Sequence, residues 1–151
     1  MRVGQGIDVH RFSEDPLRPL VLGGVVIEGA RGLGGHSDAD AVLGAVGLGD
    51  LGRHFPDSDP AWEGANSVEL LTQVMRMAAA EGFACANADC TVVAETPRLA
   101  PHTEAMASVL REVLGAPVSV KATRAEGLGA LGRAEGIACL AVVLMDEVVS
   151  P

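Results

Sequence analysis

The stretch that decides the fold class is residues 91–122, TVVAETPRLAPHTEAMASVLREVLGAPVSVKA. The β-branched run Thr91–Ala94 predicts a strand, and Pro101 is typical of the first position of a helix. Gly115 is expected to end that helix, and Val118–Ala122 predicts the next strand. The apolar residues of the helix recur at i, i+3, i+4, i+7 and i+8, at Met106, Val109, Leu110, Val113 and Leu114. This strand–helix–strand order indicates an α/β fold.

The flanking segments extend the same pattern. Residues 1–8, 20–27 and 137–145 predict strands, and the strand of the opening stretch spans 83–95. Asn66 begins a second helix, with Glu69 placed for a capping box and Gly82 as the stop. We therefore expect a single α/β sandwich over residues 1–151, with one mostly mixed sheet and helices on one face. The other face would need a cover, for which an oligomer is the obvious candidate.

Two stretches rich in turn residues separate these elements. Gly29–Gly35 holds four glycines and predicts a loop, after which Ser37 or Asp38 is expected to cap a short helix. Residues 50–65 form a second predicted loop of acids, proline and glycine. Loops of that length are uncommon in compact domains unless they serve a function.

Composition excludes several classes of protein. Hydrophobic residues make up 48% and aromatic residues 3% of 151 residues, so the chain can build an aliphatic core and is not disordered. The net charge of −9 argues against a general nucleic-acid binder, although it leaves room for a phosphate ligand. No apolar run is long enough to cross a membrane. The three cysteines lack metal-binding spacing, and Met1 opens onto a strand pattern, so we expect a reducing, cytoplasmic location.

Four short clusters carry candidate chemistry. Asp8 and His10 lie two apart on a strand and so face one side, which suits half of a Zn²⁺ site or an ordinary turn cap. The segment His36–Asp40 stands where a helix N-terminus could bind phosphate, or where Ser37 or Asp38 merely caps the helix. The acids of Asp50–Asp59 could hold hydroxyls or a divalent cation, or form a solvated turn. Lys121–Gly136 mixes bases, Thr and Glu at a strand end, where either a ligand or a charged connection fits.

The order of these clusters resembles a known family. GQGIDVH, GHSDAD, GDLGxxFPDSDP, VKATxxEGLG and GRxEGIA closely resemble 2-C-methyl-D-erythritol 2,4-cyclodiphosphate synthases of the non-mevalonate isoprenoid route. The resemblance covers essentially the whole chain. It implies that the substrate is 4-diphosphocytidyl-2-C-methyl-D-erythritol 2-phosphate. The 2-phosphate attacks the β-phosphorus, CMP leaves and a cyclic diphosphate forms, with Zn²⁺ and a second cation, Mg²⁺ or Mn²⁺, neutralising charge.

The resemblance also implies a homotrimer whose active sites lie between subunits, with Arg133 and Glu135 near the three-fold axis. Asp8 and His10 would bind zinc, and Glu126 would bind Mg²⁺. His36 would assist in the transition state, and Ala94–Ala100 would surround the cytosine. The expected substrate contacts are Asp8, Val9, His10, His36, Ser37, Asp50, Leu51, Gly52, Phe55, Pro56, Asp57, Ser58, Asp59, Ala94, Glu95, Thr96, Pro97, Arg98, Leu99, Ala100, Thr123, Arg124, Ala125, Glu126, Ala130 and Arg133.

The chain departs from the family pattern at two places. After Leu43 the family continues its helix with a third zinc-binding His, whereas here Gly44 follows and about two helical turns are missing. The gap is either a true deletion or a segment that a structure leaves unresolved. The second is favoured, because losing a core helix and a metal ligand together should disrupt the fold; it predicts a wide gap between Leu43 and Gly44. His54 is a remote substitute ligand.

The second departure is at Arg124 and Ala125, where the family carries Thr. Arg124 could donate to a phosphate in place of the family's hydroxyl, which makes it a candidate catalytic residue. Two functions follow: an active cyclodiphosphate synthase, or a zinc-poor relative that trimerises and binds nucleotide or prenyl diphosphate without turnover. The third zinc ligand discriminates between them.

Overall fold

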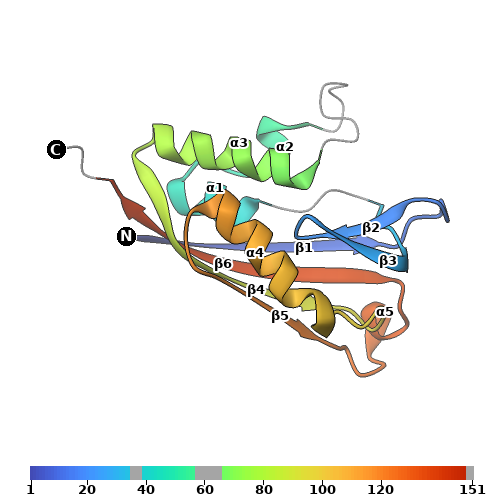
Figure 1. Ribbon diagram of the computed structural model, residues 1–151. Helices are drawn as coiled ribbons and strands as arrows, with labels where there is room; N and C mark the ends of the chain where they lie inside the picture. Colours follow the sequence, from blue (N-terminus) through green and yellow to red (C-terminus); the bar gives the residue numbers. More distant parts are fainter. Residues whose placement is uncertain (35–38, 57–65, 149–151) are drawn as a thin grey trace.

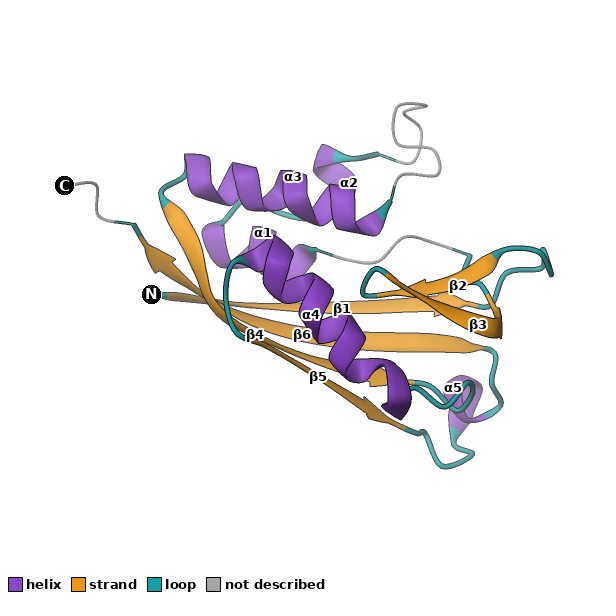
Figure 2. Ribbon diagram, viewed as in Figure 1, coloured by secondary structure: helices purple, strands orange, loops and turns teal. Residues whose placement is uncertain are grey.

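The long strands β1 (Arg2–Arg11), β6 (Gly136–Glu147), β4 (Phe83–Val93) and β5 (Val118–Thr123) form one sheet in that order. β4 and β5 run parallel, while β1 and β4 are antiparallel to β6. The computed structural model describes residues 1–34, 39–56 and 66–148. Helices cover one face of this mixed sheet (Figures 1 and 2), as the sequence predicts.

The helices differ in length. The long ones are α3 (Ser67–Ala80) and α4 (Thr103–Leu114), and the short ones are α1 (Asp40–Val46), α2 (Leu51–His54), α5 (Gly129–Gly132) and the 3₁₀ turn η2 (Ala100–His102). The side chain of Asn66 accepts a hydrogen bond from the amide of Val68, so the predicted N-cap of α3 is confirmed. α4 ends at Gly115, whose φ of 64° suits glycine.

The predicted strand at 20–27 is wrong in one respect. The segment forms two strands, β2 (Pro19–Leu22) and β3 (Val25–Arg31), which pair as a separate antiparallel hairpin. Gly23 and Gly24 both have positive φ and make the turn between them. β3 also takes up Gly29, the first residue of the predicted glycine-rich loop.

α1 packs directly on β1. A Cβ atom built on Gly4 would lie 1.8 Å from the carbonyl oxygen of Ala41, and one on Gly6 would lie 2.9 Å from the Ala41 nitrogen. Larger residues at Gly4 or Gly6 would force helix and strand apart. The glycines of the first strand therefore fix where α1 lies relative to Asp8 and His10.

α1 also corrects two predictions. The helix runs without interruption through Leu43 and Gly44, so the expected gap there is wrong and the short helix is a property of the chain. Its N-cap is Ala39, without a side-chain cap, and not Ser37 or Asp38. Asp40 instead accepts a hydrogen bond from the amide of Leu51 at 2.6 Å, which ties α1 to α2. The predicted loop at 50–65 thus includes a short helix.

Two clusters of buried apolar residues lie between helices and sheet. The first joins α1 and α3 to residues such as Phe83 and Met145, and the second joins the β2–β3 hairpin to Val92 and Met106. Val120 packs against both clusters. The core is thus divided along the length of the sheet.

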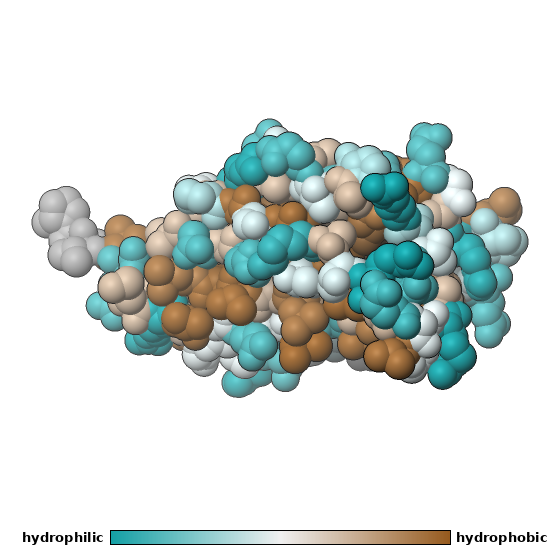
Figure 3. Space-filling model, turned by 90° about the horizontal axis from the view of Figure 1, so that it is seen from below, coloured by the Kyte–Doolittle hydropathy of each residue, from teal (hydrophilic) through white to brown (hydrophobic). Residues whose placement is uncertain are grey.

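The opposite face of the sheet carries exposed apolar side chains. Val3, Ile7 and Val9 of β1 are 68%, 59% and 61% exposed, and Leu140 and Val142 of β6 are also exposed. Figure 3 looks at the molecule from this side and shows apolar atoms gathered over the sheet. In the described part of the chain, no helix covers this face.

Candidate active site

One end of the sheet collects most of the predicted site residues. β1, β4 and β5 all finish at this end and β6 begins there, because β6 runs antiparallel to β1 and β4. His10 pairs with Ile137, and Val93 pairs with Thr123. The clusters from the N-terminus, the middle and the C-terminal third of the chain therefore meet at a single end of the sheet.

Asp8 and His10 face the helices, as their i, i+2 spacing predicts. His10 Nε2 lies 2.8 Å from Asp8 Oδ1, and both side chains are partly exposed. Val9, between them, points to the open face of the sheet, so only its backbone could reach a ligand at this pocket.

The fit of this pair to a zinc ion is incomplete. Aspartate and histidine are suitable ligands, but a catalytic zinc site takes three from the protein. Within the described residues, no group of three His, Cys, Asp or Glu side chains is placed to hold a metal ion. His54, the substitute considered above, lies 2.8 Å through Nε2 from the carbonyl oxygen of Leu48. The described residues thus supply two zinc ligands and do not complete a site.

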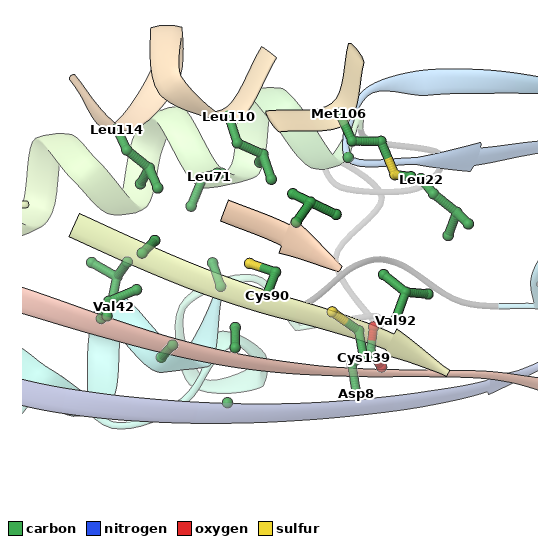
Figure 4. A pocket seen from close by; sticks show the side chains of 18 of the residues that line it. Asp8, Leu22, Val42, Leu71, Cys90, Val92, Met106, Leu110, Leu114 and Cys139 are labelled. Atoms are coloured by element: carbon green, nitrogen blue, oxygen red, sulfur yellow. The ribbon is translucent and has the colours of Figure 1, made fainter. Parts of the chain in front are cut away.

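Asp8 and His10 also line an apolar cavity of about 140 Å³ between sheet and helices. Figure 4 shows side chains of α4 facing those of β4 across it, with Asp8 at one end near Cys139. The remaining walls come from the β2–β3 hairpin, α1, α3, β5 and β6. Burial raises the pKa of the Cys90 thiol, with the charge of Asp89 adding to the effect, so this wall residue stays neutral.

A second cavity, of about 390 Å³, lies beyond the ends of β4 and β5. Its walls are Ala94, Glu95, Pro97, Arg98, Leu99, Ala100, Ala122, Thr123 and Arg124. Thr96 precedes Pro97 through a cis peptide bond, which turns the segment back on itself. The two cavities share no lining residue. The predicted cytosine-binding segment and the predicted phosphate-contacting Arg124 are therefore together in one chain.

An ion pair crosses the wall of this second cavity. Arg124 donates through Nη2 to Oε1 of Glu95 at 2.5 Å, with the arginine mostly exposed and the carboxylate mostly buried. The other oxygen, Oε2, is buried and has no hydrogen-bond partner in the part of the chain that the structure describes. A buried acceptor without a donor is costly, so this oxygen marks a place where a ligand donor could bind.

The predicted residues after β5 are exposed near the same end of the sheet. Glu126 has a positive φ of 53°, and Arg133 pairs with Glu135 at 2.7 Å. Ala125, Ala130 and Arg133 line neither cavity. The backbone N–H of Phe12 donates to the carbonyl oxygen of Glu135 at 3.0 Å, which joins this connection to the end of β1.

The Asp50–Pro56 part of the predicted site is not brought to either cavity within one chain. Asp50 caps α2 by accepting from the amide of Arg53, and Phe55 is buried in the first core cluster. Leu51, Gly52 and Pro56 line neither cavity. The predicted site residues His36, Ser37, Asp57, Ser58 and Asp59 lie outside the described residues.

Sequence reasoning missed parts of both cavities. Ala122 lines the second cavity, and the strand alternation that places Val118 and Val120 inward could have indicated it. Most of the apolar cavity also escaped prediction, because its walls come from elements far apart in the sequence.

No helix among the described residues is long and apolar enough to span a membrane.

The family comparison matches nearly the whole chain. The model of the YgbB family matches residues 1–146. A 2-C-methyl-D-erythritol 2,4-cyclodiphosphate synthase from Geobacillus kaustophilus is 51% identical, covering 97% of this chain and 98% of its own. The enzyme of the same name from Symbiobacterium thermophilum is 53% identical, covering 96% and 98%. The first alignment runs over 157 positions, more than the 151 residues here, so this relative carries residues that the chain lacks.

A solved structure agrees with the fold. A 2C-methyl-D-erythritol-2,4-cyclodiphosphate synthase, described as the CDP-bound form, is 36% identical with a TM-score of 0.84. The match covers 96% of this chain and all of that one.

Proposed function

This chain belongs to the YgbB family of 2-C-methyl-D-erythritol 2,4-cyclodiphosphate synthases, and we propose that the cytidine part of its substrate binds in the cavity at the ends of β4 and β5. The enzyme makes 2-C-methyl-D-erythritol 2,4-cyclodiphosphate in isoprenoid biosynthesis. It acts on 4-diphosphocytidyl-2-C-methyl-D-erythritol 2-phosphate and releases CMP. We assign it to the phosphorus–oxygen lyases and to the cytoplasm.

The observation that carries the assignment of the nucleotide is the cavity at Glu95 and Arg124. The polar backbone of residues 94–100 borders it and can contact the edge of a base. The unpaired Oε2 of Glu95 would accept a hydrogen bond from an exocyclic amino group, which cytosine has and uracil lacks. Arg124, at the mouth, would meet the diphosphate. The base is thus read by donors and acceptors, and the charge is met by a cation.

The chemistry needs positioning more than covalent catalysis. An oxygen of the 2-phosphate attacks the β-phosphorus, the bond from that phosphorus to the CMP oxygen breaks, and CMP departs with the electron pair. The chain must hold two anionic groups together and offset their repulsion. Arg124 supplies one positive charge, and His36 would act nearer to the reacting phosphate.

The metals are part of the proposal in a limited form. Asp8 and His10 would hold Zn²⁺, and Glu126 would hold Mg²⁺ or Mn²⁺; bound cations would neutralise phosphate charge as Lewis acids. Because the described residues supply only two zinc ligands, no step is derived through the ion, and we expect zinc to bind more weakly than in a three-ligand site.

A homotrimer would bring the separate parts of the site together. Support comes from the exposed apolar face of the sheet, with Val3, Ile7 and Val142, which a neighbouring subunit would cover. Within one chain, the Asp8–His10 pair and the nucleotide cavity do not join, and Asp50–Pro56 borders neither. We propose that segments of neighbouring subunits combine to form each active site.

The test of the function is CMP release by the purified full chain from 4-diphosphocytidyl-2-C-methyl-D-erythritol 2-phosphate, followed by chromatography with added Zn²⁺ and Mg²⁺. Stoichiometric CMP and cyclic diphosphate are expected. In parallel, calorimetry should give tighter binding of CDP than of UDP. Equal affinities for the two nucleotides would contradict the role assigned to Glu95.

The incomplete zinc ligand set favours one second candidate, a catalytically weak relative that binds the nucleotide or a prenyl diphosphate. It predicts CDP binding with a turnover that zinc does not increase. A rate that rises with added Zn²⁺ and saturates would favour the enzyme.

A further inference from the structure

We propose that the apolar cavity between sheet and helices binds a small, uncharged, hydrocarbon-like ligand of about the size of a benzene ring. The cavity measures about 140 Å³. Cavities of roughly 150 Å³ lined by aliphatic and aromatic side chains stay dry and bind benzene or xenon. This inference does not depend on the proposed function.

The chemistry of the walls selects the ligand. Leu110 and Leu114 of α4 and Leu71 of α3 form one side, and Cys90 and Val92 of β4 face them (Figure 4). Among all the lining residues, only Asp8 and His10 carry nitrogen or oxygen in their side chains. Water would find few partners in most of this space, so an apolar ligand is favoured over ordered water.

The cavity lies where the two core clusters meet. Leu114 and Val143 of the first cluster and Met106 and Ile137 of the second all border it. Protein interiors are normally packed to nearly crystalline density, so a space of this size in the centre of the core is unusual. It is an underfilled centre, not a surface irregularity.

The short α1 accounts for the missing volume. Ala41 and Val42 of α1 border the cavity, and the helix ends soon afterwards at Val46. The alignment with the relative from Geobacillus kaustophilus is longer than this chain, and the motif comparison places the missing residues between Leu43 and Gly44. About two further turns of helix at that point would occupy space beside Val42. The cavity is therefore a specific feature of this chain.

A route of entry exists at one end. The side chains of Asp8 and His10 are 18% and 28% exposed, whereas Met106 at the wall is buried. A ligand entering there passes a carboxylate, in a chain with a net charge of −9. Anions should therefore be rejected even when they carry a ring of the right size.

The first test is a thermal melt of the full chain with millimolar benzene or benzoate. Benzene is expected to raise Tm by about 1–3 °C, and benzoate to leave it unchanged. Crystals under xenon pressure should show xenon between Leu110 and Cys90. No shift with benzene together with no xenon in the cavity would overturn the proposal, as would an equal shift with benzoate.

The second test fills the space. Ala88→Leu adds a larger side chain at a lining position of β4, while Ala107→Leu makes the same change at a buried position of α4 that borders neither cavity. Ala88→Leu should raise Tm and remove the benzene response. Ala107→Leu should lower Tm by overpacking and keep the response. Should Ala88→Leu fail to fold, Ala141→Val adds less volume at another lining position. A filled variant that still responds to benzene would contradict the assignment.

Discussion

The two cavities at this end of the molecule are built in different ways. The nucleotide cavity is formed by one continuous segment, residues 94–100, and by the end of the neighbouring strand β5. The apolar cavity and its Asp8–His10 end depend on side chains from β1, α1, α3, α4, β4 and β6, among other elements. Shortening α1 leaves the first cavity's walls in place but alters the second. A site made by a local segment thus tolerates a change elsewhere that a site made by distant helices does not.

The largest expected effect is from Ile7→Asp, which puts a charge on the open face of the sheet. Ile7 is 59% exposed in a single chain, and we expect a neighbouring subunit to cover it. Burying an unpaired carboxylate there should dissociate the trimer and reduce turnover by about 100-fold or more. Light scattering coupled to gel filtration measures the change in mass.

Leu17→Asp is the matched control, because Leu17 is exposed in the loop after β1. It should leave the assembly unchanged. A wild-type chain that is monomeric at micromolar concentration would refute the claim that both cavities need a neighbour.

The next effect is from His10→Ala, which removes one of the two zinc ligands. We expect zinc affinity and turnover to fall by about 10–100-fold or more, while CDP affinity changes little because His10 does not border the nucleotide cavity. Steady-state kinetics and calorimetry with CDP separate the two readouts. His102→Ala, in η2, should leave both unchanged. Retained activity in metal-stripped buffer would contradict the role of His10.

A smaller effect is expected from Arg124→Thr, which places a family-type residue at the mouth of the nucleotide cavity. Loss of the guanidinium leaves the Glu95 carboxylate without its partner and removes a phosphate donor, so CDP should bind about 3–10-fold more weakly. Arg111→Thr is the control, because it breaks the Arg111–Glu104 pair on α4 away from both cavities. Unchanged or tighter CDP binding in Arg124→Thr would show that the ion pair closes the cavity instead.

The smallest expected effect concerns Cys90 and alkaline pH. Burial raises the pKa of this thiol in the folded chain, so the unfolded chain loses the proton at a lower pH. Stability from the neutral thiol is therefore complete below the ordinary thiol pKa and is lost as pH rises through the raised value. Between pH 8 and pH 10, the Tm of the wild type should fall by about 1–2 °C more than that of Cys90→Ala. Parallel curves would contradict this assignment.

Local patterns in the sequence predicted much of the architecture. The stripe of α4, the Asn66 cap of α3 and the i, i+2 placement of Asp8 and His10 all follow from spacing of a few residues, and the structure confirms them. The predicted strand at 20–27 was wrong, because two neighbouring glycines with positive φ turn the chain within an apolar run.

Distant packing could not be predicted in the same way. Asp40 is occupied with the Leu51 amide, a contact between two helices that neither segment's sequence indicates. The gap expected after Leu43 was wrong for a related reason. The prediction assumed that a core helix cannot lose two turns, whereas the chain keeps α1 continuous and leaves a cavity beside it. The size of that cavity depends on side chains from several elements at once.

The central claim is that this chain keeps the nucleotide cavity of its family but has an incomplete zinc site. The most direct test is a zinc titration of the purified full chain against a chelator of known affinity, in the same preparation that binds CDP. The account predicts clear CDP binding together with zinc binding at least about 10-fold weaker than that of a relative with the longer helix, measured in parallel. Stoichiometric zinc held as tightly as in that relative would contradict it.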